Sequence, residues 1–469
     1  MSSNGHIVQL SSLIMDSVKV VLAEYEKVGR EVPSLDDTSP SPFDTPESVP
    51  LALSKAIRTI EAACAQLTYT VASPGHIMVN KTYAHCEIAG MLLVCNTKIA
   101  DLLLDYPEGL SVSDLSQKSG LEMSKLHRIL RLLATKHCFR EASCKVHSVR
   151  PGVFANNRLS IKLLSADPVS STVAQGADDL HKATACLNEI LQDPSKGPSF
   201  EVKDCAFVSA WGSNPFEFYS KPENEMYAQR FGGAMIGWAE VTGSKMLSKV
   251  YPWKDHPQDT VICDVGGAKG HVTMDLVQAF PHLKIVLQDL PPLIQQATEF
   301  WKTDHPSAVA NQRVSFVDFD FFKESPVPGC DFYYVTHSLQ AVCDLIIQRV
   351  TLSSCVTHDW PDKQCIEILS NIRKVMKPTS HVLIQEIVLQ NVALTSSESG
   401  DFIQAPLPLL PNYGVAQARQ YNQDINMMAI FNSRERSLSD FIDLGTQVGL
   451  KFLRMWDTME TGIVEFIVA

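Results

Sequence analysis

A glycine-rich turn after an apolar run is the first feature of the sequence that could do chemistry. The run TVICDVGGAKGH begins at Thr260 and predicts a strand that ends at Asp264, after which Gly266, Gly267 and Gly270 lead into a helix. Glycines at a strand-to-helix turn let the backbone approach a ligand closely and open the helix N-terminus toward it. The pattern predicts a nucleotide-type binding site, and the alternative is a turn with ordinary glycines and a capping acid.

Acidic residues at the ends of the next two expected strands fit the ribose and adenine of such a ligand. Asp289, followed by Leu290, ends the run KIVLQDLP. An acid at this offset from the glycines can accept hydrogen bonds from both ribose hydroxyls. The following strand leads to Asp320 and Phe321 in VDFDFF, a carboxylate and an aromatic ring that could hold an adenine.

Two kinds of ligand fit a site for a ribose and an adenine at this position, and the turn discriminates between them. A dinucleotide favours Gly-x-Gly-x-x-Gly, and Ala268 interrupts that pattern. Asp264 would repel a pyrophosphate, but it would attract an ammonium or sulfonium group. The expected cofactor is therefore S-adenosylmethionine.

Six short motifs follow one another along the chain: CDVGGAKGH, LQDLP, DFDFF, HDWPD, LIQEIVL and DINMMAIFNSRERSLSDF. In these motifs the chain resembles the plant caffeic-acid-type and fungal small-molecule (polyketide) O-methyltransferases, from about residue 50 to residue 469. The resemblance implies an α/β fold, with a Rossmann-like class I methyltransferase domain whose mostly parallel sheet has an antiparallel last strand. An α-helical winged-helix domain that forms a homodimer would precede it. The chain departs from the family at Ala268, where glycine is usual, and at Thr336, where many relatives have Arg or Lys.

A methyl transfer to a phenol requires a positioned base and little else. A phenol has a pKa near 10 and is mostly protonated at pH 7, whereas a sulfonium methyl group is already activated. Histidine is the natural base at this pH. The resemblance implies that the base is His358, in the motif His-Asp-Trp, and that Glu386 and Glu435 orient its imidazole. Taken singly, each of the three residues is more often structural: the histidine could be a helix cap, and the glutamates could be surface charges.

Two apolar clusters could clamp the flat ring of an acceptor. Flexible thioethers and aromatic rings suit that task, and the alternative is core packing at helical spacing. The candidates are Phe231, Met235 and Trp238 in MYAQRFGGAMIGW, and Met427, Met428 and Phe431 in NMMAIF. The expected acceptor is a hydroxyl of an aromatic, polyketide-type small molecule. No metal is expected, because no set of carboxylate and histidine ligands stands out.

The triplet Val-Thr-His occurs twice, at 335–337 and at 356–358. In the family the fourth strand runs almost directly into the His-Asp-Trp motif, so the comparison leaves residues 338–355 in excess and makes His358 the base. One hypothesis is that this segment is a translated intron or a gene-model error, because it interrupts the tightest part of the site. The alternative is a genuine inserted helix that bulges outward, since its apolar residues have amphipathic spacing.

The elements that must position these residues alternate along the second half of the chain. Strands are expected at 261–265, 283–288, 313–317, 331–335 and 381–389, and helices at 269–280, 291–302 and 362–376. This alternation indicates βαβ units on a mostly parallel sheet, and the last two strands, in KFLRMWDT and GIVEFIVA, should pair antiparallel.

Three segments are expected along the chain. Residues 1–50 read as an amphipathic helix over 10–29 and a linker, and residues 51–220 as the helical, winged-helix dimerisation domain. Within the latter, a short helix from about Ser113, a break at Gly120 and a second helix have helix–turn–helix character. Residues 221–469 read as the catalytic domain.

The composition of the chain disfavours some partners and compartments. The 469 residues carry a net charge of −12, which disfavours non-specific binding to nucleic acid or to an anionic membrane. No secretory signal or uninterrupted apolar span is apparent, and the twelve cysteines show no zinc spacing, so a cytoplasmic protein with reduced thiols is expected. Two alternatives stay open: a catalytically silent relative that binds the cofactor as a scaffold, and a winged-helix DNA regulator.

Overall fold

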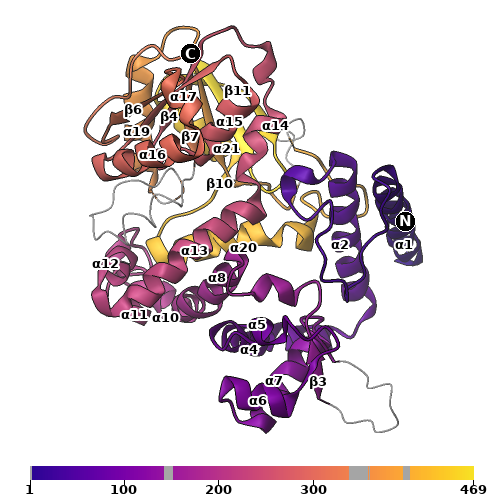
Figure 1. Ribbon diagram of the computed structural model, residues 1–469. Coiled ribbons are helices and arrows are strands. Elements are labelled where there is room, and N and C mark those ends of the chain that lie inside the picture. The colour runs from indigo at the N-terminus through magenta and orange to yellow at the C-terminus, as the bar shows by residue number, and fades with distance from the viewer. Residues whose placement is uncertain (1–2, 142–151, 337–357, 359, 394–401) are drawn as a thin grey trace. The chain divides into compact units, whose positions relative to one another are not determined.

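The computed structural model describes residues 3–141, 152–336, 358, 360–393 and 402–469 (Figure 1). These residues form two compact units. The first contains the chain up to His181 together with Gly233–Val241, and the second contains Lys182–Gly232 and Thr242–Ala469. The domain boundaries expected after residues 50 and 220 stay a prediction.

Helices make up most of the first unit: α1 (Ser3–Lys27), α2 (Leu51–Val71), α3 (Pro74–Thr82), α4 (Ala84–Asn96), α5 (Ile99–Leu103), α6 (Val112–Ser119), α7 (Met123–Thr135) and α8 (Pro168–Gln175). Helix α1 packs along α2. Its buried positions Leu10, Ser17 and Glu24 recur every seven residues, the spacing of two helices that lie side by side. The helix expected over 10–29 is thus confirmed, although it begins earlier.

Helix α1 is also long and apolar enough to cross a membrane, by length and composition alone. The segment Asn4–Lys27 reaches a mean hydropathy of 1.4, and little of it is buried. One helix of this kind is weak evidence of a membrane span, because core helices and signal sequences share its length and composition. The expected absence of a membrane partner stays a prediction.

A winged helix–turn–helix follows in the first unit. Ser111 caps α6 by accepting a hydrogen bond from the backbone N–H of Asp114, and Gly120 ends α6 at a φ of 74°. A small antiparallel sheet in the order β1-β3-β2 completes the motif, with strands β1 (Leu110–Ser111), β2 (Arg140–Glu141) and β3 (Val153–Ala155). The winged-helix expectation is confirmed.

The second unit is built on a seven-stranded sheet with the order β11-β12-β8-β7-β4-β5-β6. The strands are β4 (Thr260–Val265), β5 (Leu283–Asp289), β6 (Val314–Asp318), β7 (Phe332–Thr336), β8 (His381–Glu386), β11 (Leu450–Asp457) and β12 (Gly462–Val468). Strands β4 to β8 run parallel, and β12 is antiparallel to both of its neighbours. The predicted mostly parallel sheet with an antiparallel end is therefore confirmed.

Helices accompany this sheet: α9 (His181–Thr184), α10 (Leu187–Gln192), α11 (Ala206–Trp211), α12 (Pro215–Ser220), α13 (Glu225–Thr242), α14 (Leu247–Val250), α15 (His271–Ala279), α16 (Pro291–Asp304), α17 (Pro306–Ala310), α19 (Asp362–Val375), α20 (Ala418–Phe431) and α21 (Leu438–Gln447). Helix α13 belongs to both units, because its residues Gly233–Val241 are part of the first. A short parallel pair, β9 (Val388–Leu389) with β10 (Arg436–Ser437), extends from the end of β8.

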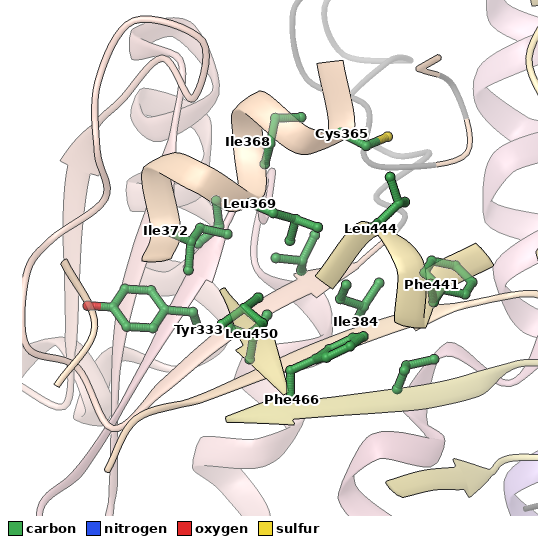
Figure 2. Packing of buried hydrophobic residues seen from close by; sticks show 14 of the residues in the cluster. Tyr333, Cys365, Ile368, Leu369, Ile372, Ile384, Phe441, Leu444, Leu450 and Phe466 are labelled. Atoms are coloured by element: carbon green, nitrogen blue, oxygen red, sulfur yellow. The ribbon is translucent and has the colours of Figure 1, made fainter. Parts of the chain in front are cut away.

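Each face of the sheet has its own core. Successive side chains in a strand point to opposite faces, so Tyr333 enters one core and its neighbour Tyr334 the other. Figure 2 shows the first core, in which Ile368 and Leu369 of α19 and Phe441 of α21 pack over the strands. The second core contains the fully buried Trp301 of α16.

The strand order reverses direction beside β4. Strands β5 and β6 follow on one side of β4, and β7 and β8 follow on the other. In open parallel sheets a ligand crevice forms outside the carboxyl ends of the strands at such a switch point. The glycine-rich turn after β4 lies at this position.

Candidate active site

Backbone conformation explains the glycines of the turn between β4 and α15. Gly266 and Gly270 have φ values of 73° and 72°, which side chains disfavour. At position 267 a Cβ atom would collide with the carboxyl group of Asp264 and with Leu287. Glycines at positions 266, 267 and 270 therefore allow the close approach of the backbone at this turn.

Ala268 is the exception within this turn. Its φ is 50°, a left-handed conformation that costs a non-glycine residue about 1–2 kcal/mol. Its buried backbone N–H donates to Oδ2 of Asp289 at 2.8 Å. That hydrogen bond ties the turn to the end of β5, and it accounts for the conformation that Ala268 adopts.

Asp264 has an unsatisfied carboxylate oxygen. Its Oδ2 accepts a hydrogen bond from the hydroxyl of Thr273 at 2.7 Å, whereas its Oδ1 is buried and has no hydrogen-bond partner among the described residues. Burial raises the pKa of Asp264 to about 7, although the Thr273 hydroxyl lowers it. A buried carboxylate beside a glycine turn fits a ligand that brings a positive charge or a donor.

Asp289 is the second buried carboxylate at this edge of the sheet. Its oxygens accept from the backbone N–H groups of Ala268 at 2.8 Å and of Leu290 at 2.7 Å. Burial raises the pKa of Asp289 to about 7, against these two N–H groups. A carboxylate has about four acceptor positions, so two hydrogen bonds leave capacity for ribose hydroxyls. The donors and the charge at this turn fit S-adenosylmethionine.

The two residues expected to hold an adenine, Asp320 and Phe321, make contacts with other residues of the protein. The carboxylate of Asp320 accepts from the backbone N–H of Phe322 at 3.1 Å and pairs with Lys323 at 2.7 Å. The ring of Phe321 is buried in the first core and meets Phe322 edge-on. Phe322, which the sequence did not single out, contacts Trp360 with ring centroids 5.0 Å apart. The role of Asp320 and Phe321 in binding adenine stays a prediction.

His358 and Glu435 form a buried pair. Nδ1 of His358 lies 2.9 Å from Oε1 of Glu435, and the two side chains are 1% and 0% exposed. An Nδ1–H that donates to Glu435 leaves Nε2 as the basic nitrogen. Oε2 of Glu435 is buried and has no hydrogen-bond partner among the described residues. The pair has the arrangement of a base with its orienting carboxylate.

The β9–β10 pair explains how these distant residues meet. Glu386 is the buried last residue of β8, and β9 begins two residues later. In the parallel pairing Arg436 lies opposite Val388, which places the preceding Glu435 next to the end of β8. The three residues implied as catalytic thus gather at the carboxyl end of the sheet.

The expected acceptor residues divide between the two units. Phe231, Met427, Met428 and Phe431 belong to the second unit, and Met235 and Trp238 belong to the first. Phe231 contacts Tyr219 with ring centroids 4.7 Å apart, and Phe431 stacks on Phe216 at 5.1 Å. Their role in holding an acceptor stays a prediction.

Some expectations lie outside the described residues. These are the hypotheses about the insert 338–355 and the position of Asp359. Among the residues that the structure describes, no group of three or more His, Cys, Asp or Glu side chains could hold a metal ion.

The sheet, the glycine turn at its switch point and the two buried carboxylates define a class, that of the Rossmann-like proteins that bind S-adenosylmethionine. Residues 195–451 match the O-methyltransferase domain, and residues 83–166 match the O-methyltransferase dimerisation domain. The chain belongs to the O-methyltransferase family. This assignment decides against the alternative of a DNA regulator.

Individual relatives agree with the family assignment. The chain is 41% identical to 3-O-methyltransferase 2 of Phanerochaete chrysosporium over 462 residues, which cover 98% of this chain and 97% of the relative. The fold is similar to that of the mitomycin 7-O-methyltransferase MmcR, with a TM-score of 0.61, 22% identity and coverage of 84% and 98%. It is also similar to LepI in complex with SAM, with a TM-score of 0.65, 18% identity and coverage of 90% and 96%. The protein is an S-adenosylmethionine-dependent O-methyltransferase of the secondary-metabolite type.

Proposed function

We propose that the protein methylates a hydroxyl group of an aromatic, polyketide-type small molecule and that His358 is the general base. The observation that carries this proposal is the buried pair of His358 and Glu435, 2.9 Å apart, at the carboxyl end of the sheet. A histidine held by a carboxylate keeps one tautomer and gains basicity at the other nitrogen.

The residues around the pair have complementary tasks in this proposal. S-adenosylmethionine supplies a methyl group on a positively charged sulfur, which departs as a neutral thioether. Nε2 of His358 takes the hydroxyl proton as the oxygen attacks, and Glu435 stabilises the imidazolium that forms. Glu386, buried at the end of β8, adds negative charge on the same side. Asp264 offers its open oxygen to the cationic cofactor.

The proposed acceptor is supported by the surroundings of α20. Met427 and Phe431 are buried on this helix, and Phe216 stacks on Phe431. Thioethers and stacked rings suit a flat aromatic acceptor. The name of the relative 3-O-methyltransferase 2 also refers to a position on an oxygen-bearing acceptor. We further propose a cytoplasmic homodimer, formed through the dimerisation domain at residues 83–166.

The test is an incubation of a phenolic library with the protein and methyl-labelled S-adenosylmethionine, followed by mass spectrometry. A His358→Ala control should lose at least about a hundredfold in rate, within the range typical of a general base. Undiminished methylation in that control would retire the assignment of the base.

A second candidate is a catalytically impaired relative that binds the cofactor as a scaffold or partner. The strained Ala268 in the cofactor turn supports it. Calorimetric binding of S-adenosylmethionine without turnover on the whole phenol panel would favour this candidate.

The hypothesis about residues 338–355 has its own test. Sequencing of the mature transcript decides whether the segment is translated. If it is an artefact, a variant that lacks these residues should keep or exceed the methyl transfer of the full chain. Uninterrupted coverage of codons 338–355 in the dominant message would refute the hypothesis.

A further inference from the structure

Arg436 is a fully buried cation next to Glu435. Its side chain is 0% exposed, and it belongs to the short strand β10. A guanidinium is always charged in proteins, and burial of a charge is costly unless it is paired and hydrogen-bonded. A buried arginine at this position therefore requires partners that compensate its charge and accept its hydrogen bonds.

Those partners lie on the segment that carries His358. Nη2 of Arg436 donates to the carbonyl oxygen of Trp360 at 2.9 Å and to Oδ1 of Asp362 at 2.7 Å. Nε donates to the same Oδ1 at 3.1 Å. Glu435 meanwhile contacts His358 itself. Two consecutive residues, Glu435 and Arg436, thus hold both ends of one short segment.

The charge of Arg436 also interacts with Glu386, one of the proposed catalytic carboxylates. Burial by itself lowers the pKa of Arg436, but Cys365, the hydrogen bond to Asp362 and the charge of Glu386 together raise it. Glu386 is therefore close enough for its charge to be partly balanced by the guanidinium. Arg436 connects three elements of the site: the end of β8, β10 and the start of α19.

We propose that Arg436 is a positioning residue that keeps His358 in register with Glu435 by fixing the Trp360 carbonyl and Asp362. This inference rests on the proposed function of His358 as the base. The backbone on the C-terminal side of His358 is anchored by these hydrogen bonds, so the imidazole keeps its hydrogen bond to Glu435 and directs Nε2 to the acceptor. Displacement of a base by about 1 Å can cost about a hundredfold in rate.

The chain offers a matched control in Arg434. Its Nη2 pairs with Oδ2 of the same Asp362 at 2.8 Å, but its side chain is 48% exposed. It also lies 3.6 Å from Asp440. Arg434 and Arg436 thus share one carboxylate, and only Arg436 is buried and donates to the Trp360 carbonyl.

The experiment compares wild type, Arg436→Lys, Arg434→Ala and His358→Ala on two acceptors. One is a phenol that the wild type methylates, and the other is the same phenol with a nitro group para to the hydroxyl. The assay pH is set well above the pKa of the nitro compound and below that of the unsubstituted phenol, so the nitro compound is ionised and needs no base. Lysine keeps the positive charge but cannot reproduce the fixed fork of donors.

For the unsubstituted phenol, Arg436→Lys should lower kcat about tenfold to a hundredfold, with KM for S-adenosylmethionine within about twofold of wild type. For the nitro compound the loss should be at most about threefold. His358→Ala should show the same dependence on the acceptor, and Arg434→Ala should stay within about twofold on both acceptors.

Other outcomes overturn the inference in distinguishable ways. Equal losses on the two acceptors for Arg436→Lys would assign a purely structural role to Arg436. Equal losses for Arg434→Ala and Arg436→Lys would attribute the effect to Asp362 alone. A His358→Ala variant without any loss on the unsubstituted phenol would overturn the proposed base and this inference together, whereas a loss confined to His358→Ala would overturn only the role of Arg436.

Discussion

Among the described residues of the second unit, two histidine–glutamate pairs lie at opposite ends of the parallel strands, one at the start of β8 and one near its end. His381 begins β8 and lies 2.7 Å from Oε1 of Glu465, while His358 lies 2.9 Å from Oε1 of Glu435 near the end of the same strand. Both pairs use Nδ1, and both glutamates are buried. Sequence spacing alone would not distinguish a catalytic pair from a structural one.

The surroundings of the two glutamates differ. Glu465 also accepts hydrogen bonds from the hydroxyl of Tyr251 at 2.8 Å and from Nε1 of Trp456 at 2.9 Å. Glu435 has a buried oxygen without a hydrogen-bond partner among the described residues. His381 is 28% exposed, and His358 is 1% exposed. A buried carboxylate whose hydrogen bonds are complete stabilises a fold, whereas an incomplete one suits a site where charge must change during a reaction.

The largest expected effect comes from removing the charge of each glutamate with an isosteric substitution. Glu435→Gln should lower kcat about a hundredfold, because the neutral amide cannot stabilise imidazolium. Glu465→Gln should leave kcat within about threefold and lower the free energy of unfolding by about 2 kcal/mol, because charged hydrogen bonds are lost. Steady-state kinetics and denaturant unfolding of both variants check this. Equal effects of the two changes on kcat would contradict the distinction.

The affinity for the cofactor should depend on pH through two buried carboxylates at the carboxyl ends of the strands. Burial raises the pKa of Asp264 and of Asp289 to about 7 at the carboxyl edge, and a cationic cofactor binds best when they are ionised. The affinity for S-adenosylmethionine should therefore fall about fivefold per carboxylate as the pH drops from 7 to 6, and change little above pH 8. Calorimetric titration measures it. Asp264→Asn should bind weakly at every pH and with a shallower pH dependence.

Acid unfolding should depend on Glu465, which pairs with His381 at the start of β8. Burial raises the pKa of Glu465, but hydrogen bonds from His381, Trp456 and Tyr251 outweigh it, so the pKa lies below its ordinary value of 4.5. A lowered folded pKa means that the stabilisation is present above the unfolded pKa and is lost as the pH falls through the folded pKa. Glu465→Gln should lose less stability than wild type, by about 1 kcal/mol, between pH 5 and pH 3. Identical acid unfolding curves would count against this assignment.

The smallest expected effect concerns backbone strain at the two ends of β4. Ala268 after β4 and Asp259 before it have φ values of 50° and 65°. Ala268→Gly should raise stability by about 1 kcal/mol and tighten cofactor binding a few-fold, because the left-handed conformation is relieved at the binding turn. Asp259→Gly is the matched control and should leave the cofactor affinity unchanged. Aspartate tolerates this conformation, and Asp259 also pairs with Lys284 at 3.0 Å. Tighter cofactor binding in both variants would show that the effect does not arise from strain at the glycine-rich turn.

Much of the second unit was predictable from local sequence. The five parallel strands lie within a residue or two of their expected bounds, except that the run 381–389 is divided into β8 and β9. The helices α15, α16 and α19 also lie close to expectation. These elements have local signatures: apolar residues at every second position, acidic residues at strand ends, and glycines where φ is positive. Such signatures can be recognised without knowledge of the fold.

The class of fold and the position of the glycine-rich turn could be predicted from the sequence, because those features depend on neighbouring residues. Which charged residues meet depends on the packing of the whole unit. Glu435 reaches His358 only because β10 pairs with β9, and Arg436 reaches Trp360 and Asp362 for the same reason. The packing of the unit also places the ring of Phe321 in the core. Contacts between distant segments depend on how strands pair and helices pack, which local patterns do not specify.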